Sequence, residues 1–208
     1  MNKHLMKAFA AAVAALALTA CSEAPQPTAT KTDEPKKEAP APVAPVAAKT
    51  AFYEIYKPAR TWATDIVVLS MASEELPGFK NEGGKAAVWK AVLGSASQHA
   101  ARTFTYAIAN AGAYTKGASA APPQAWGGPT KQALSFTQSD FQIDSDAAVK
   151  AASEKAVDWL KANPDKKLSL MLGAASQFPA PVWKVQWGTD KGGYVVFVNA
   201  TTGTIVTK

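Results

Sequence analysis

Apolar positions recur first with helical spacing and then in strand-like runs, from about residue 51 onwards. Phe52, Ile55 and Trp62 are apolar positions of a short predicted helix, in which Pro58 marks either the start or a kink. The apolar run over 66–71 is either a buried strand or an extension of this helix. The elements expected here are a helix over 52–64 and strands over 66–71, 88–93 and 103–108.

The same order of elements recurs in the last third of the chain. Asp144 is the expected N-cap of a second helix, Asp146 lies in its first turn, and Asn163-Pro164 ends it. The strands that follow are expected over 167–172, 182–187, 194–198 and 204–206. Helices followed by antiparallel strands predict an α+β fold, with helices packed on antiparallel sheets.

Short sequence matches suggest that the two segments are copies of one α-β-β-β unit. The matched pairs, with their separations in residues, are Trp62 with Trp159 (97), Leu69-Ser70-Met71 with Leu168-Ser169-Leu170 (99) and Val88-Trp89-Lys90 with Val182-Trp183-Lys184 (94). Matches of this length also arise by chance, so the duplication is a hypothesis. It requires the two Val-Trp-Lys segments to occupy equivalent strands. The corresponding units would be residues 51–132 and 133–208.

The second unit carries a family pattern in three places. The residues are Ile143-Asp144-Ser145-Asp146-Ala147-Ala148, Val182-Trp183-Lys184-Val185 and the run 194–205, which ends in a turn and a last strand. Over residues 141–208 the chain resembles the PepSY domain. Asn199 stands where that family usually has Asp, which keeps the turn-forming acceptor and loses the charge. The resemblance implies a binding or inhibitory module and assigns no catalytic residue.

A further apolar run lies at the N-terminus. Lys3 and Lys7 precede this run, which covers residues 8–18. It ends in Leu18-Thr19-Ala20-Cys21, with small residues before the cysteine. The run is shorter than the roughly 20 residues that a permanent membrane span needs. It resembles a bacterial lipoprotein signal with its lipobox, which implies a signal peptide over 1–20 and a lipid on Cys21. A plain secretory peptide, or a buried helix with a stray cysteine, is the alternative.

Residues 21–50 are rich in Ala, Pro, Lys, Glu and Thr, with the run 39–45 as their most proline-rich part. Proline lacks a backbone donor and favours extended geometry, so this segment is predicted to be a disordered linker that holds the folded part away from the membrane. The layout as a whole resembles uncharacterised periplasmic lipoproteins. Ser22 is not the Asp typical of inner-membrane retention in lipoproteins, so an outer-membrane anchor is expected in a cell with two membranes.

Composition and charge are those of an ordinary globular protein. Hydrophobic residues make up 48% of the 208 and charged residues 18%, with a formal net charge of +6. No Lys/Arg run or basic helix face stands out, so nucleic acid is not an expected partner. The expected partners are the membrane, through the lipid anchor, and an envelope protein, peptide or glycan.

Catalytic and metal-binding patterns are weak. His99 is the one histidine after the signal peptide, and it lies in a Ser- and Ala-rich loop where a solvated side chain is expected. Asp140, Asp144 and Asp146 are spaced a little like a calcium loop but lack its central glycine and final glutamate, so helix capping explains them better. We therefore expect no enzyme activity, no metal and no cofactor.

Tryptophan supplies the candidates for binding. Trp183 and Trp187 point to the same side of one strand, which is either the core or an exposed aromatic platform. Trp126 lies in a Gly- and Pro-containing loop and is the better candidate for ligand binding. The expected function is a lipid-anchored, non-enzymatic binding module of the cell envelope. A structural or envelope-maintenance lipoprotein is the alternative, and a hydrolase is less expected.

Overall fold

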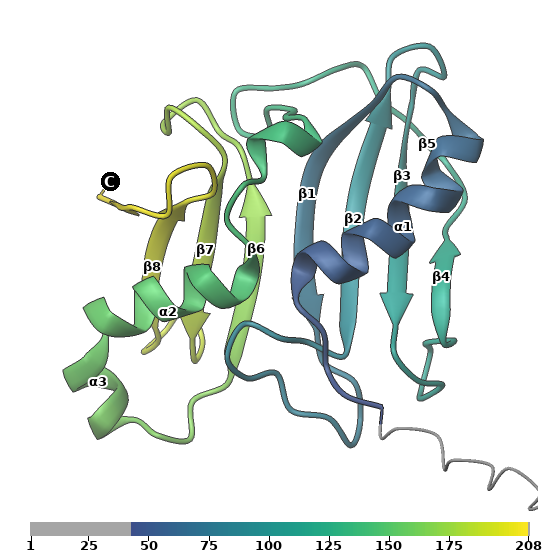
Figure 1. Cartoon of the computed structure of the whole chain (residues 1–208). Helices are drawn as coiled ribbons and strands as arrows, with labels where there is room; N and C mark the ends of the chain where they lie inside the picture. Colours follow the sequence, from purple (N-terminus) through teal and green to yellow (C-terminus); the bar gives the residue numbers. More distant parts are fainter. Residues whose placement is uncertain (1–42, 208) are drawn as a thin grey trace, which may run out of the picture. The chain divides into compact units, whose positions relative to one another are not determined.

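One antiparallel sheet runs through residues 43–207, the part of the chain that the computed structural model describes (Figure 1). Its order is β4-β3-β2-β1-β6-β7-β8-β9, with β5 also paired to β3. The strands are β1 (Ile66–Glu74), β2 (Val88–Ser95), β3 (Ala100–Ala107), β4 (Gly117–Ala120), β5 (Gln124–Ala125), β6 (Leu168–Gly173), β7 (Val182–Trp187), β8 (Tyr194–Asn199) and β9 (Ile205–Val206). The helices are α1 (Ala48–Trp62), α2 (Ser145–Lys155), α3 (Val157–Ala162) and the 3₁₀ turn η1 (Gln138–Asp140).

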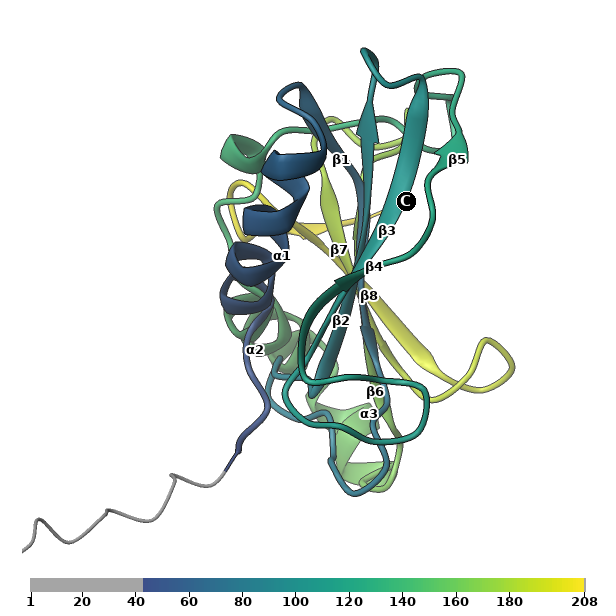
Figure 2. The same ribbon diagram turned by 90° about the vertical axis from the view of Figure 1, so that its right-hand side faces the viewer.

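Helices α1 and α2 pack on the same face of this sheet, which confirms the α+β class predicted from the sequence (Figure 2). Helix α1 lies over the half that contains β1 to β4, and α2 lies over the half that contains β6 to β8 (Figure 1). The core between the helices and the sheet is one continuous apolar cluster. The opposite side of the sheet is called the open face below.

The two halves of the sheet are arranged as a repeated unit. Strands β1 and β6 pair at the centre, and the later strands of each unit follow outward in the same order. Trp89 in β2 pairs with Ser73, and Trp183 in β7 pairs with Leu172, so the two Val-Trp-Lys segments occupy equivalent strands. The first-strand partners lie 99 residues apart, the separation seen in the sequence match.

The helices repeat the same correspondence. The buried positions Ala51, Phe52, Ile55 and Ala59 of α1 are matched, 97 residues later, by the buried Ala148, Val149, Ala152 and Ala156. The predicted boundary near residue 132 thus falls in the connection between two halves that share one sheet.

The equivalent tryptophans meet at the centre of the core. Both are fully buried, and their ring centroids lie 6.2 Å apart in an edge-to-face arrangement. The indole nitrogen of Trp89 donates to the Val46 carbonyl and that of Trp183 donates to the Ile143 carbonyl, each at 2.9 Å. Each bond holds the backbone two residues before a helix against the sheet, so each tryptophan positions the start of the helix in its own half.

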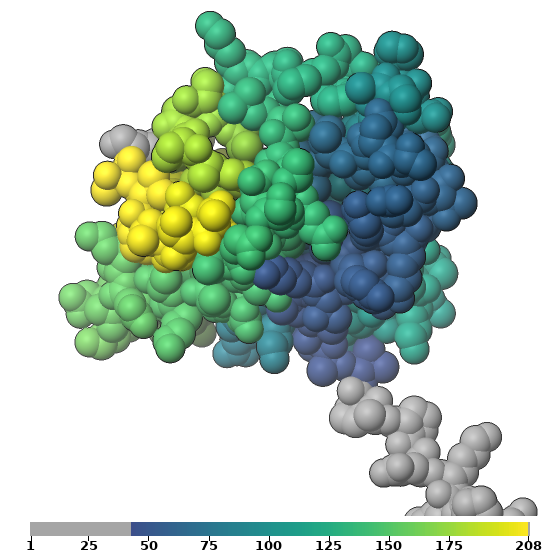
Figure 3. Space-filling model, turned by 45° about the horizontal axis from the view of Figure 1, so that its top comes forward, coloured from purple at the N-terminus to yellow at the C-terminus, as the bar shows by residue number. Residues whose placement is uncertain are grey.

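The first turns of α1 and α2 are joined by hydrogen bonds. The blue-purple segment around α1 and the green segment around α2 lie side by side in Figure 3. Ser145 Oγ accepts from the Ala48 N–H at 2.9 Å and donates to the Gly84 carbonyl at 2.6 Å. Asp144 Oδ1 accepts from the Lys49 N–H at 3.0 Å and from the Ser145 N–H at 2.7 Å. A residue of the second half therefore caps the helix of the first half.

Three local predictions differ from the structure. Helix α1 begins at Ala48, inside the segment predicted as linker over 21–50, because Val46 pairs with Ala86 and Ser145 supplies the missing cap. Pro58 lies inside α1 and does not start it. The predicted second helix is divided at Ala156 into α2 and α3.

Residues 112–131, which follow β3 and lead toward the second half, contain β4 and β5. The strand β4 is made of Gly, Ala and Ser, which have low strand propensity, so its pairing with β3 has no local sequence signal. None of the helices in residues 43–207 has both the length and the apolar character that crossing a membrane requires.

Candidate functional site

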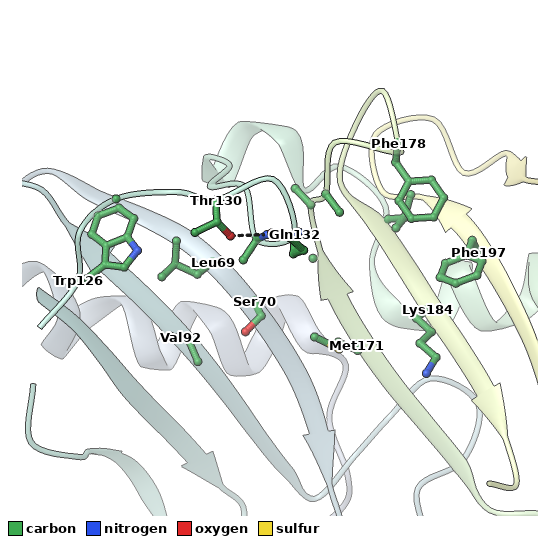
Figure 4. Close-up of a pocket in the computed structure, with 16 residues that line it drawn as sticks. Leu69, Ser70, Val92, Trp126, Thr130, Gln132, Met171, Phe178, Lys184 and Phe197 are labelled. Atoms are coloured by element: carbon green, nitrogen blue, oxygen red, sulfur yellow. Dashed lines mark hydrogen bonds between the residues drawn. The ribbon is translucent and has the colours of Figure 1, made fainter. Parts of the chain in front are cut away.

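An apolar groove with a cavity volume of about 480 Å³ lies on the open face, across the seam between β1 and β6 (Figure 4). Its floor includes a row of directly paired residues from four neighbouring strands: Val92, Ser70, Gly173 and Val182. Trp126 stands at one side and Phe178 at the other. We call this cavity the open-face groove.

Strand alternation decides which side chains reach the groove. In β7, Trp183 and Trp187 point to the helices, so Val182 and Lys184 point to the open face. In β1, a bulge at Leu69 shifts the register, and both Leu69 and Ser70 line the groove. An open sheet face is ordinarily polar. The apolar lining departs from this pattern, and exposed apolar patches often mark binding sites.

Trp126 forms the first wall and rests on a glycine. Its six-membered ring covers Gly94, where an added Cβ would lie 2.9 Å from Cζ3 of the indole. The backbone N–H of Trp126 donates to the His99 carbonyl at 3.0 Å, which ties the loop to the turn between β2 and β3. The indole is half-buried, so part of its surface remains available to a ligand.

The second wall is the segment around Phe178, whose ring lies 5.2 Å from that of Phe197 between centroids. This segment is bonded to the first wall: the Leu134 N–H donates to the Ala174 carbonyl, and the Ser176 N–H to the Lys131 carbonyl, both at 2.9 Å. Between the walls, Met171 is 49% exposed, and a Cβ at Gly173 would have no neighbour within 4 Å. Backbone hydrogen bonds thus join the segments of the two walls, and the floor between them is open at Gly173.

Lys184 is the one charged side chain among the described residues that line the open-face groove. Its ammonium lies 3.8 Å from the Asp190 carboxylate, and these side chains are 36% and 88% exposed. A pair that is this long and this exposed contributes little stability. Lys90, the equivalent residue in the first half, lies 3.1 Å from Glu74, which raises the pKa of Lys90 against the opposing effect of burial.

The first half has its open face covered where the second half does not. Leu76, Val88, Ala107 and Ile108 form a small buried cluster of their own there, packed against partly buried neighbours that include Tyr114. The connections after β1 and β3 supply most of this cover. The apolar groove therefore is not a general property of the repeated unit.

For Trp183 and Trp187 the sequence left two alternatives, the core or an exposed platform, and the structure excludes the platform. Both are buried against the helices, so they belong to the core and form no exposed platform. Trp126 lies at the groove, and its role in binding stays a prediction. Sequence reasoning missed Met171, Phe178 and Phe197. Strand alternation around Met171 could have shown that its side chain points to the open face of the sheet. Nothing in the local sequence indicated that the ring of Phe178 would contact that of Phe197.

Asp140 and Asp144, whose spacing is a little like that of a calcium loop, make structural hydrogen bonds, and so does Asp65. Asp140 accepts from the Thr137 backbone at 2.8 Å, which lowers its pKa, and Asp144 caps α2. Asp65 accepts from Ser95 Oγ at 2.6 Å and from the Ser97 N–H at 2.8 Å. These bonds hold the pKa of Asp65 well below its usual range.

His99 lies in the turn after β2, with a φ of 48°. In residues 43–207 no group of three or more His, Cys, Asp or Glu side chains is placed to hold a metal ion. Cys21, the signal peptide over 1–20 and most of the predicted linker lie outside the described residues.

Neither a protein-family model nor a curated protein sequence matches the chain. Among solved structures, the chain is similar to a "putative lipoprotein" from Clostridium difficile 630, with 10% sequence identity and a TM-score of 0.44. The similarity covers 76% of this chain and 90% of that one. At these values it assigns neither a family nor a function. The resemblances to PepSY domains and to lipoprotein signals stay predictions from the sequence.

Proposed function

We propose that this protein is a lipid-anchored, non-enzymatic binding module of the bacterial cell envelope, and that the open-face groove is its binding site. The observation that carries the proposal is the apolar groove of about 480 Å³ on the sheet face opposite α1 and α2. Its volume is in the range of small-molecule sites, and its lining is mainly aliphatic and aromatic. Such a lining suits binding by contact rather than acid–base chemistry.

The anchor rests on the N-terminal sequence. Leu18-Thr19-Ala20-Cys21 supplies the expected cleavage and lipidation point, and the linker gives the folded part reach from the membrane. Ser22 favours an outer-membrane anchor that faces the periplasm in a cell with two membranes. The alternative of an envelope-maintenance lipoprotein without a small ligand predicts an empty groove, so a binding measurement separates the two.

Replacing Cys21 is expected to abolish lipidation completely. Cells that express the wild-type chain and are fed an alkyne-tagged palmitate should label the protein, whereas Cys21→Ala should carry no label and should keep residues 1–20. The matched control is Ser22→Ala, which should be labelled like the wild type. In-gel fluorescence and the intact mass of the purified chain measure both results. Label on Cys21→Ala would contradict the anchor.

Filling the groove is expected to block binding of an apolar probe. The dye N-phenyl-1-naphthylamine fluoresces in apolar surroundings and should titrate the full-length Cys21→Ala chain with saturation. Adding Gly173→Val should weaken dye binding at least about tenfold, because the new side chain enters open space on the groove floor. The fold should be kept, since valine suits a strand.

Ser169→Val is the control for this variant, because Ser169 is exposed on the same strand and face but outside the groove. It should bind the dye like its parent. Equal dye binding by Gly173→Val and Ser169→Val, or no saturable binding at all, would remove the groove as the site.

A further inference from the structure

The floor row of the open-face groove is apolar except for Ser70, and Lys184 is the one charged side chain among the described residues of the lining. Met171 and Phe197 flank Lys184 from the two neighbouring strands, directly opposite it in the sheet register. From there the groove continues past Gly173 to Trp126 on the far side (Figure 4). A ligand that fits this arrangement has a long apolar part and one group that pairs with an ammonium.

A peptide does not match the lining. Each residue of a peptide brings a backbone donor and acceptor, and burying these groups without partners is costly. The groove offers side chains of a sheet face and not the free edge of a strand. Ser70, Thr130 and Gln132 are its uncharged polar side chains, which are few partners for a peptide backbone. An alkyl chain needs none, and each buried methylene contributes about 0.8 kcal/mol.

The length of the floor suits an alkyl chain of moderate length. The row Val92, Ser70, Gly173 and Val182 crosses four strands. Three inter-strand spacings amount to about 14 Å. Lys184 lies two residues beyond Val182, and Trp126 rests on Gly94, two residues beyond Val92 in the opposite direction, so the diagonal between them is about 19 Å, close to the extended length of about 16 carbons. The half-buried ring of Trp126 offers a flat apolar surface for the end of such a chain.

Lys184 selects the head group. Its long, exposed contact with Asp190 can be exchanged for a ligand carboxylate at little cost. Such a carboxylate would form a charge-assisted hydrogen bond with the ammonium, while a cationic head would be repelled. The equivalent Lys90 has a closer carboxylate partner in Glu74 and does not line the groove.

We propose that the open-face groove binds a free fatty acid, with the carboxylate at Lys184 and the alkyl chain directed across the β1–β6 seam toward Trp126. The inference rests on the proposed function and names its ligand class.

The test uses the full-length Cys21→Ala chain and competition with the bound dye. Dodecanoate should displace N-phenyl-1-naphthylamine with an affinity about tenfold higher than that of dodecan-1-ol, and dodecyltrimethylammonium should bind more weakly than either. Lys184→Met should bring dodecanoate and dodecan-1-ol to within about threefold of each other. The matched control Lys90→Met should keep the wild-type preference.

The direction of the chain is tested by quenching. Bromine at the chain end quenches tryptophan fluorescence on contact, so 16-bromohexadecanoate should quench part of the emission. Trp126→Phe should remove that quenching at ligand concentrations at which displacement of the dye shows the groove of the variant to be occupied. Quenching that persists in Trp126→Phe would overturn the proposed orientation.

Two results would overturn the ligand class: equal affinities for dodecanoate and dodecan-1-ol in the parent chain, or an unchanged preference in Lys184→Met. If the dye binds in the groove and dodecanoate does not displace it, the fatty-acid inference falls while the binding function stands. If the dye itself shows no groove-dependent binding, both fall.

Discussion

Trp183→Ala is expected to lower the free energy of unfolding by about 4 kcal/mol. The side chain is fully buried, contacts Trp89 and Phe141 through its ring, and donates to the Ile143 carbonyl. Alanine would leave a large cavity and an unpaired carbonyl just before α2. Urea denaturation followed by far-ultraviolet circular dichroism measures the change.

Trp183→Phe is the matched variant, because it keeps most of the buried ring and loses the hydrogen bond. Its expected loss is about 1–2 kcal/mol. Trp89→Ala should resemble Trp183→Ala, since Trp89 makes the equivalent bond to Val46. A loss below about 1 kcal/mol for Trp183→Ala would mean that the residue is not part of the core and would reopen its assignment as a surface aromatic.

Gly84→Ala is expected to destabilise the protein by about 3 kcal/mol. Gly84 has a φ of 82°, which costs a residue with a Cβ about 1–2 kcal/mol. An added Cβ would also overlap the Ser145 carbonyl and the Asp146 Cα, which are backbone atoms of the α2 start. The first turn of α2 would have to move, and with it the cap on Ala48.

The neighbouring Gly83 separates the two causes. It has a φ of 56°, and a Cβ there would meet nothing within 4 Å. Gly83→Ala should therefore lose only about 1–2 kcal/mol, the cost of the backbone conformation alone. Equal midpoints for the two variants in the same urea titration would show that the close approach of Gly84 to α2 does not limit stability.

The periodicity of apolar residues was enough to predict the α+β class and most of the long strands. Short sequence matches suggested the duplication, and Trp89 and Trp183 keep the same residue type at equivalent core positions. The pairing of β1 with β6 was not predictable, since one sequence contains no information on register between distant strands. The start of α1 was missed because its cap, Ser145, lies 97 residues away in the chain.

Of the residues that line the candidate site, the sequence indicated one, Trp126. Trp126 stood out because a tryptophan in a Gly- and Pro-containing loop has no periodic core to join. The alternation in β7 favoured the core for Trp183, because Trp183 shares its face with Val185 and Trp187 while Lys184 and Gln186 lie on the other face. The groove arises from tertiary features, namely the bulge at Leu69, the bare floor at Gly173 and the loop contacts that raise the two walls.

The shared cap at Ser145 has a consequence for how the chain folds. The first turn of α1 reaches its full set of hydrogen bonds only after a residue 97 positions later has arrived, so the N-terminal half made alone lacks part of its own helix start. On a ribosome, the first half would wait for the second, and hydrogen exchange at the Ala48 and Lys49 amides should report unfolding of the whole molecule rather than of one half.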